Sequence, residues 1–344
     1  MALERNREDQ PPGEDQLIAK MVELGTARTV PQAGRVRRGQ HAKPLGCVRG
    51  TFTVREDLPA ELRHGVFQMP GKTYDAIVRF SNSSDNLGPD AKGAARGIAI
   101  KLLNVEGERA VAVGTDRSQD FLAVNHPVFP FPGPAEYVGF FSVKAWPVVG
   151  EVASLVWLVV GHPHILRIVQ AIRSKVIASP LEITYWSGSP YWLGPPNGGP
   201  ATGQAVKYAV VPHASGTPIP SDLKQLPADY LGDALQRHLR EREAVFDFKV
   251  QVQKDPKTMP IEDASIEWDE TVSPPETVAT LRIPAQDVNS PEGRELANQC
   301  EAMSFTPWNA LANHRPMGGI NRLRKAVYLA SVKARTEAAR TSAT

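Results

Sequence analysis

Seven short runs of β-branched and aromatic residues, in two groups separated by a helical stretch, constrain the fold of this chain more than any other feature. Gly, Pro, Asn and Asp clusters bound these runs, as expected for strands that end in turns. The predicted strands are residues 50–54, 75–81, 97–103, 120–124, 204–212, 246–253 and 278–284. The run FDFKVQVQ at 246–253 alternates almost strictly, which is typical of a strand with one buried face.

Helical patterns occupy the spaces that the strands leave. They are predicted at residues 15–24, within 128–179, and at 228–240, 291–303 and 320–339. Strands, helices, strands and helices in that order favour an α+β fold, an antiparallel β-barrel with packed helices, over a doubly wound parallel sheet. No linker or repeat divides the 344 residues, so we expect an N-terminal arm at 1–34 and a single domain at 35–344.

Composition excludes several classes of protein. Apolar residues make up 42% and charged residues 22%, as in ordered globular chains. The net charge of +2 gives no reason to expect nucleic acid as a partner. Two cysteines, Cys47 and Cys300, exclude a disulfide-rich scaffold and a four-cysteine zinc site. Low cysteine use and an N-terminus without a signal-like apolar core predict a cytoplasmic protein.

The most apolar stretch is residues 145–161, AWPVVGEVASLVWLVVG. Pro147 and Glu151 interrupt it and leave about ten clean apolar residues, against roughly 20 for a spanning helix. We therefore predict no membrane-spanning segment and interpret the stretch as a buried helix. The alternative is a surface that meets lipid or an apolar substrate, with Trp146 and Trp157 at the interface.

The last predicted helix carries a suggestive arrangement of side chains. Arg324, Tyr328, Ser331 and Arg335 are spaced so that all four share one helix face. A guanidinium beside a phenol favours the phenolate, and a phenolate is one of the few protein ligands of haem iron. Taken alone, an arginine four residues before a tyrosine is common, and a structural, salt-bridging helix is the more frequent explanation.

Three other segments carry side chains that suit the same chemistry. His41 precedes the first predicted strand, and Arg38 stands three residues before it. Arg79 and Ser81 are two apart and therefore on one face of their strand. Asn125 ends an apolar strand, where its amide can point into a cavity.

The motifs HAK, VRFS, ARGIAIK, VNHPVF, SFTPWN and RKAVY occur in the order found in haem catalases, and the chain resembles that superfamily, in particular its short catalase-like peroxidases. The motifs extend from about residue 38 to residue 335. The resemblance implies a catalase-like haem core without the C-terminal domain of large catalases. It also implies haem b as the cofactor, with ferric iron held by a tyrosinate.

The resemblance implies a role for each matching residue. Tyr328 corresponds to the proximal iron ligand, which Arg324 keeps as a phenolate. His41 corresponds to the distal acid–base group, Ser81 to its hydrogen-bond partner, and Asn125 to the amide that orients peroxide. The other implied cofactor contacts are Arg38, Arg79 and Arg335 for the propionates, Phe129 for the pocket wall, and Phe140 or Phe141 for stacking on the porphyrin.

Two departures from the family pattern affect these expectations. Leu329 and Ala330 follow the tyrosine where catalases usually have Asp-Thr, so local hydrogen bonding differs. His126 follows Asn125 in place of a small polar residue. Neighbouring strand residues point in opposite directions, so we expect His126 to pack outside the pocket.

The implied activity is reduction of organic hydroperoxides and hydrogen peroxide through a ferryl intermediate, with weak to moderate catalase turnover. The partners would be small-molecule peroxides and an organic electron donor, and the assembly a homodimer or homotetramer. Two alternatives stay open. One is a haem-dependent fatty-acid hydroperoxide isomerase or lyase similar to an allene oxide synthase, and the other is a non-catalytic haem-binding protein.

Overall fold

The structure is a computed structural model that describes residues 5–26, 31–32, 35–36, 38, 40–83, 88–91, 93–111, 117–199 and 202–341. Side chains are described for these residues except 26, 31–32, 35–36 and 335–341.

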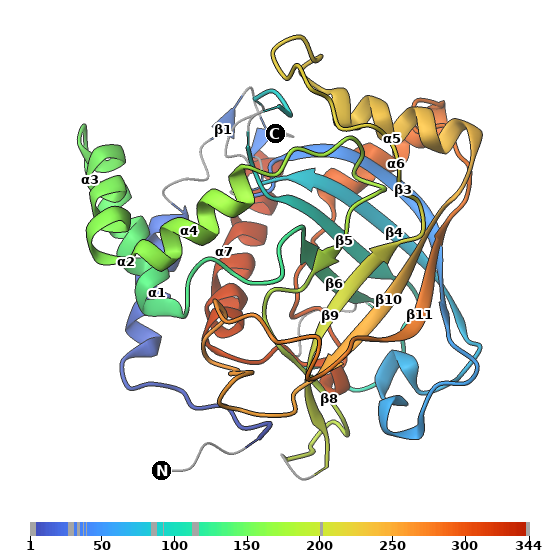
Figure 1. Cartoon of the computed structure of the whole chain (residues 1–344), viewed down its shortest axis with the longest axis horizontal. Coiled ribbons are helices and arrows are strands. Elements are labelled where there is room, and N and C mark those ends of the chain that lie inside the picture. The colour runs from blue at the N-terminus through green and yellow to red at the C-terminus, as the bar shows by residue number, and fades with distance from the viewer. Residues whose placement is uncertain are drawn as a thin grey trace.

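Eight antiparallel strands close into a barrel (Figure 1). The sheet order is β10-β11-β3-β4-β5-β6-β7-β9, and pairing of β9 with β10 closes it. The barrel strands are β3 (Lys43–Val54), β4 (Thr73–Asn82), β5 (Arg96–Leu102), β6 (Gln119–Val124), β7 (Tyr185–Trp186), β9 (Gln204–Pro212), β10 (Ala244–Val252) and β11 (Glu276–Ile283). A short strand, β8 (Tyr191–Leu193), adds to β9, and β1 (Pro31–Gln32) pairs with β2 (Arg35–Val36). The predicted antiparallel barrel with packed helices is confirmed.

The helices lie on the outside of this barrel and at its ends (Figure 1). They are α1 (Glu14–Thr26), α2 (Pro134–Lys144), α3 (Gly150–Val156), α4 (Pro163–Arg173), α5 (Tyr230–Glu241), α6 (Pro291–Ala302) and α7 (Gly319–Thr341), with short turns at Ala60–Leu62, Gly65–Phe67 and Ala312–His314 and a π-helical turn at Trp157–Gly161. Helix α1 packs on α2 and α7. An ion-pair cluster joins Arg322 of α7 to Glu8, Glu14 and Glu262, and so fastens the N-terminal segment to the body.

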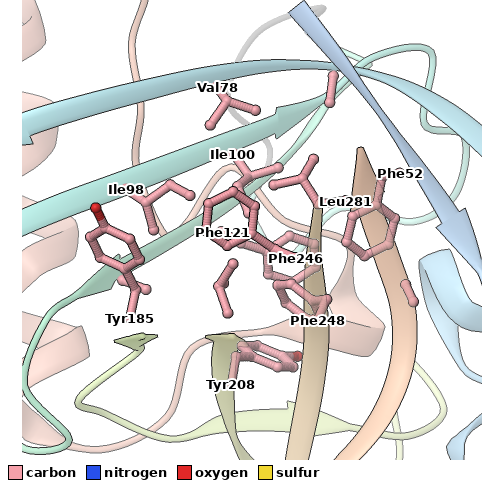
Figure 2. Close-up of a cluster of buried hydrophobic side chains, with 14 of the residues drawn as sticks. Phe52, Val78, Ile98, Ile100, Phe121, Tyr185, Tyr208, Phe246, Phe248 and Leu281 are labelled. Atoms are coloured by element: carbon pink, nitrogen blue, oxygen red, sulfur yellow. The ribbon is translucent and has the colours of Figure 1, made fainter. Parts of the chain in front are cut away.

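Aromatic side chains fill the interior of the barrel. The ring centroids of Phe121 and Phe248 are 4.7 Å apart, and those of Phe52 and Phe248 are 5.2 Å apart. Figure 2 shows these rings pointing inward from different strands, together with Tyr208. Barrels of eight strands leave an interior that side chains can fill. Any sizeable ligand therefore binds outside the barrel.

The prediction that residues 145–161 form a buried helix is wrong. The stretch forms α3 and the π-helical turn as a projection from the body, well away from the barrel (Figure 1). Val148 is fully exposed and Val160 is 78% exposed, whereas Gly150, Ser154 and Leu158 are buried. The stretch therefore buries one narrow face, which packs on α2 and, at the π-helical turn, on α4.

In the described part of the chain, no helix is by itself long and apolar enough to cross a membrane. One pair, Gly150–Gly161 and Pro163–Arg173, would pass on combined length and composition, but it bends by 116° at the break.

Cys47 of β3 and Cys300 of α6 form a disulfide, with Cα atoms 6.5 Å apart. The bond ties α6 to the barrel across 253 residues of sequence. Sequence analysis assigned no pairing to these cysteines. Disulfides are rare in reducing compartments, so this bond does not favour the predicted cytoplasmic location. The compartment itself stays a prediction.

Candidate active site

A cavity lies between strands β4, β5 and β6 on one side and helices α1 and α7 on the other. His41 and Tyr328 both line it, although 287 positions separate them in the sequence. The other predicted residues that line it are Arg38, Arg79, Ser81, Phe129 and Arg324. The structure therefore brings together most of the side chains that the sequence singled out.

The backbone around His41 fixes its ring against the barrel wall. His41 has a positive φ of 53°, which is uncommon for a residue with a Cβ and reflects a constrained turn before β3. Its carbonyl accepts a hydrogen bond of 3.0 Å from Arg79 Nη2, and its Nδ1 lies 3.1 Å from Ser81 Oγ. With Nδ1 engaged by the serine, Nε2 is the nitrogen left for a ligand.

Gly97 of β5 also determines the orientation of the His41 ring. It pairs with Ser81 across β4 and β5, directly beneath the imidazole. A Cβ at Gly97 would lie 2.7 Å from His41 Cε1 and Nδ1, closer than any normal contact. Only a glycine at this position allows the ring its present orientation.

The imidazole of His41 is neutral at ordinary pH. Burial, reinforced by the positive charges of Arg79 and Arg324, lowers the pKa of His41 to about 3. A neutral imidazole can accept a proton, which a general base must do.

Tyr328 lies on the opposite side of the cavity with Arg324 one helical turn before it. The Arg324 guanidinium carbon is 5.5 Å from the centre of the Tyr328 ring. Burial lowers the pKa of Arg324, but the phenols of Tyr328 and Tyr191 raise it by more, so the guanidinium stays charged. Arg324 also donates to Asn321 Oδ1 at 3.2 Å, which fixes its position on α7.

Two arginines converge at one edge of the cavity, and a carboxylate bridges them. Arg38 Nη1 lies 3.0 Å from one oxygen of Glu301, and Arg79 Nε lies 3.1 Å from the other. Arg38 also donates to the carbonyls of Cys300 and Met303 at 2.9 and 2.8 Å. Burial and the neighbouring Arg38, opposed by Glu301, lower the pKa of Arg79 to about 10. This edge therefore holds two positive charges against one carboxylate.

Asn125 is buried at the end of β6. Its Oδ1 accepts a 2.8 Å hydrogen bond from the backbone N–H of Arg96, while its Nδ2 has no partner among the described residues. Asn125 is not among the side chains lining the cavity, although its neighbour Val124 is. His126 lies outside the cavity, where its Nδ1 is 3.3 Å from the carbonyl of Val128.

The remaining predicted residues are Phe140, Phe141 and Arg335. Phe140 and Phe141 do not line the cavity; they pack with Phe131 and Trp157 in an apolar cluster whose other members include the cavity-lining Phe129 and Tyr137. Arg335 lies on α7, but its side chain is outside the described residues.

The residues present fit a haem. A phenol and a neutral imidazole face one cavity, and the buried Arg79 and the partly buried Arg38 stand at its edge. The buried Asn125 amide, next in sequence to the cavity-lining Val124, has a donor without a partner among the described residues. Apolar side chains form much of the remaining wall, as a porphyrin face requires: Met21, Ile98, Leu122, Phe129, Leu323 and Val327. No group of three or more His, Cys, Asp or Glu residues that could hold a metal ion occurs among the described residues.

Sequence reasoning missed Gly97, Glu301 and the contribution of α1. Gly97 stands within the quoted motif ARGIAIK, so its position in a family motif was the available signal. Glu301 gave no signal, because its relation to Arg38 and Arg79 arises only when α6 packs on the barrel. Met21 of α1 lines the cavity, so the segment described as an arm forms part of its wall.

Known proteins resemble this chain in sequence and in fold. No protein-family model matches it. A catalase-related peroxidase of Mycolicibacterium paratuberculosis is 27% identical over 307 residues, which cover 87% of this chain and 89% of that protein. A catalase of Latilactobacillus sakei is 31% identical over 126 residues, covering 36% of this chain and 23% of that protein.

Two solved structures share the fold. A fungal catalase superposes with a TM-score of 0.69 at 18% identity, and the match covers 97% of this chain but 65% of that one. Catalase A of Saccharomyces cerevisiae gives the same TM-score and identity, with 67% of its chain covered. The chain thus spans about two thirds of these catalases.

Proposed function

Because the chain is a short member of the catalase-like superfamily, we propose that it is a haem-dependent peroxidase that reduces organic hydroperoxides and hydrogen peroxide. Its relatives support the coarser statement that it is an oxidoreductase of the catalase fold. The observation that carries the finer proposal is the cavity that His41 and Tyr328 line together.

The cofactor in this proposal is haem b. Tyr328 would ligate the iron, and Arg38 and Arg79 would pair with the propionates, with Arg335 as a third candidate. The bound haem would supply the electrons that a peroxide O–O bond requires when it is cleaved. Arg324, whose guanidinium carbon lies 5.5 Å from the centre of the Tyr328 ring, would stabilise negative charge on the phenol oxygen that holds the iron.

The protein's own residues would manage the proton and the developing charge. His41 Nε2 accepts the hydroperoxide proton and returns it to the leaving oxygen, so one group acts as base and then as acid. Ser81 holds Nδ1 and keeps the ring in the required orientation. Asn125 Nδ2, which has no partner in the described structure, is available to the oxygen on which charge develops. One hydroperoxide, two electrons and two protons give an alcohol and water, and an organic donor supplies the electrons.

The apolar wall favours an organic hydroperoxide over hydrogen peroxide alone. Leu122, Phe129 and Val327 line the cavity beside the polar groups and offer a surface for an alkyl or acyl chain. The same wall suits a second candidate function, in which a fatty-acid hydroperoxide rearranges without an external donor.

The test is an absorption spectrum of the purified, haem-loaded protein, followed by titration with cumene hydroperoxide and hydrogen peroxide, each with and without an electron donor. We expect donor-dependent loss of peroxide. Turnover of a polyunsaturated fatty-acid hydroperoxide to a rearranged product without donor would establish the second function in its place.

Variants separate a catalyst from a passive haem binder. Tyr328→Phe should change the haem spectrum, while His41→Ala should retain haem and lose peroxide cleavage. The matched control is His213→Ala, since His213 is a half-exposed histidine paired with Asp247 far from the cavity. Equal peroxide consumption by all three variants and the native protein would refute the proposal.

A further inference from the structure

The helical projection between α2 and α4 concentrates exposed apolar side chains. We call residues 146–161 the apolar spur. Eight of the thirteen large apolar side chains that the described structure exposes fall within it. They are Trp146, Val148, Val149, Val152, Leu155, Val156, Val159 and Val160, and each is more than half exposed.

The spur is an ordered helix, so its exposure is a property of the fold. Gly150 lets the helix start close against α2, because a Cβ there would lie 2.3 Å from the carbonyl oxygen of Lys144. On the buried side, the Trp157 ring stacks on His162 with centroids 3.4 Å apart and contacts Phe140 at 5.9 Å. Residues 152, 155–156 and 159–160 recur at helical spacing and form one aliphatic stripe on the free side, and the fully exposed Val148 lies just before the helix begins.

Two exposed arginines follow the spur on α4. Residues 152–166 contain no Asp, Glu, Lys or Arg. The cations of residues 136–182 are Lys144, Arg167, Arg173 and Lys175, and the acids are Glu136, Glu151 and Glu182. Lys144 pairs with Glu151 at 3.5 Å, and Lys175 donates to the carbonyl of Asn125 at 2.8 Å. Arg167 and Arg173 are exposed on α4 and form no ion pair within the described residues.

An aliphatic stripe beside unneutralised cations matches one class of partner. Helices that lie in a membrane interface combine an apolar face, Trp at the boundary and Lys or Arg that attract anionic headgroups. Protein interfaces are instead enriched in aromatic residues and rimmed by mixed polar groups. Trp146, 56% exposed at the start of the spur, has the boundary position.

We propose that the apolar spur docks this protein on anionic lipid bilayers by inserting its aliphatic stripe into the interface, with Arg167 and Arg173 facing the headgroups. The spur lies on the bilayer and does not cross it. Its helical part, Gly150–Gly161, is about 18 Å long at the rise of an α-helix, against about 30 Å of hydrocarbon. The 116° bend before α4 turns the chain back toward the body.

The spur is continuous with the wall of the cavity. Leu158 and Trp157 belong to the same apolar cluster as Phe129 and Tyr137, and the last two line the cavity. Docking would therefore bring the apolar side of the cavity toward lipid, a source of acyl hydroperoxides. This consequence rests on the proposed function, whereas docking itself requires neither haem nor peroxide.

The test is flotation of the full-length, haem-loaded protein with vesicles of equimolar phosphatidylcholine and phosphatidylglycerol. We expect the protein to float with them, with its tryptophan emission shifted to the blue. Vesicles of phosphatidylcholine alone, or the Arg167→Gln/Arg173→Gln variant, should bind about tenfold less or weaker still, because each cation near an anionic surface contributes about 1 kcal/mol.

The stripe is tested by Val152→Asp/Val159→Asp against the control Ile219→Asp/Val272→Asp. The control places the same charges at exposed apolar residues outside the spur. The spur variant should lose at least about tenfold in partitioning, since each buried valine is worth 1.5 kcal/mol or more. The control should float like the native protein, and both variants should keep native turnover of a water-soluble hydroperoxide.

Three outcomes would overturn the proposal. One is native protein that does not float with either vesicle. Another is equal flotation of the spur variant and its control. The third is a native dimer, detected by light scattering, that the spur variant converts to monomer without any lipid binding by either form. In that case a second copy covers the stripe. Failure of the peroxidase assay leaves these measurements unaffected, so the two proposals can fail separately.

Discussion

Gly97 offers the sharpest test of how the barrel holds His41. In Gly97→Ala, the added methyl would lie 2.7 Å from two atoms of the imidazole and 3.1 Å from Ser81 Oγ. Ordinary contacts begin near 3.4 Å, so the ring must move by about 0.7 Å. The backbone cannot retreat, because β5 is hydrogen-bonded to β4 at Ser81 and to β6 at Val124. The displacement therefore falls on His41.

The expected loss follows from the size of that shift. Misplacing a reacting group by 1 Å can cost about 10²-fold, and losing a general acid–base group altogether costs about 10²–10⁴-fold. We expect Gly97→Ala to lower kcat/KM for cumene hydroperoxide by about 10–100-fold, or roughly 1.4–2.7 kcal/mol of transition-state stabilisation. Haem content should not change, because the proximal side of the cavity is untouched.

The control is Gly46→Ala. Its Cβ would meet Leu235 Cδ2 at 2.9 Å, and this methyl is the end of a side chain that can rotate away. Gly46 lies on β3 and does not line the cavity, so both variants test a strand glycine of the same barrel. Native turnover in a folded, haem-loaded Gly97→Ala protein would refute the reasoning, and so would an equal loss in the control.

Three further predictions test other parts of the account. His41→Ala should lower peroxide cleavage by about 10²–10⁴-fold with haem retained, measured by steady-state peroxide loss; haem loss would mean a different role for this residue. Reduction of the Cys47–Cys300 disulfide should lower the free energy of unfolding by about 3–5 kcal/mol, because it releases a long loop. Urea denaturation with and without reductant measures this difference, and identical curves would show that the bond does not form. Burial, with the nearby His64, lowers the pKa of His314 to about 3 from 6.5, so the unfolded chain gains a proton as pH falls below 6.5 and the folded chain does not. As the pH falls from 7 to 5, this residue should therefore lower the free energy of unfolding by about 2 kcal/mol. If denaturation curves of His314→Gln show the same pH dependence as those of the native protein, this prediction is wrong.

The barrel was largely predictable because its strands carry their own signal. Alternation in FDFKVQVQ corresponds to β10, where Phe246 and Phe248 point into the core and Asp247 is only partly buried. Strands β7 and β8 were not predicted, since two or three residues carry no period. They exist because β9 lies beside them.

The apolar spur shows where composition alone fails. A run of valines and leucines is buried only if another layer of the fold covers it. The residues of the run do not indicate whether such a layer exists. Val152 and Val159 are as apolar as any core valine, yet they are more than half exposed. The neighbouring Arg167 and Arg173 were the feature left unused in the prediction.

The candidate site was predictable to the extent that its members stand in family motifs. His41, Ser81, Arg324 and Tyr328 were named from short segments, and the fold brings all four to one cavity. Phe140 shows the limit of assigning roles from family motifs. A helix can present a neighbouring residue to the cavity while the residue assigned from the motif packs elsewhere. Tyr137 lines the cavity one turn earlier on the same helix.

Glu301 links the disulfide to the cationic edge of the cavity. Its neighbour Cys300 is bonded to β3, so the end of α6 is held where the Glu301 carboxylate reaches both Arg38 and Arg79. Arg79 is 4% exposed, and a buried guanidinium without a carboxylate is strongly destabilising. Glu301 is 42% exposed, so its carboxylate reaches solvent while it bridges the two arginines. If a haem propionate binds at this edge as proposed, it would meet two cations that are already positioned, and the disulfide would keep the Glu301 carboxylate close to both of them.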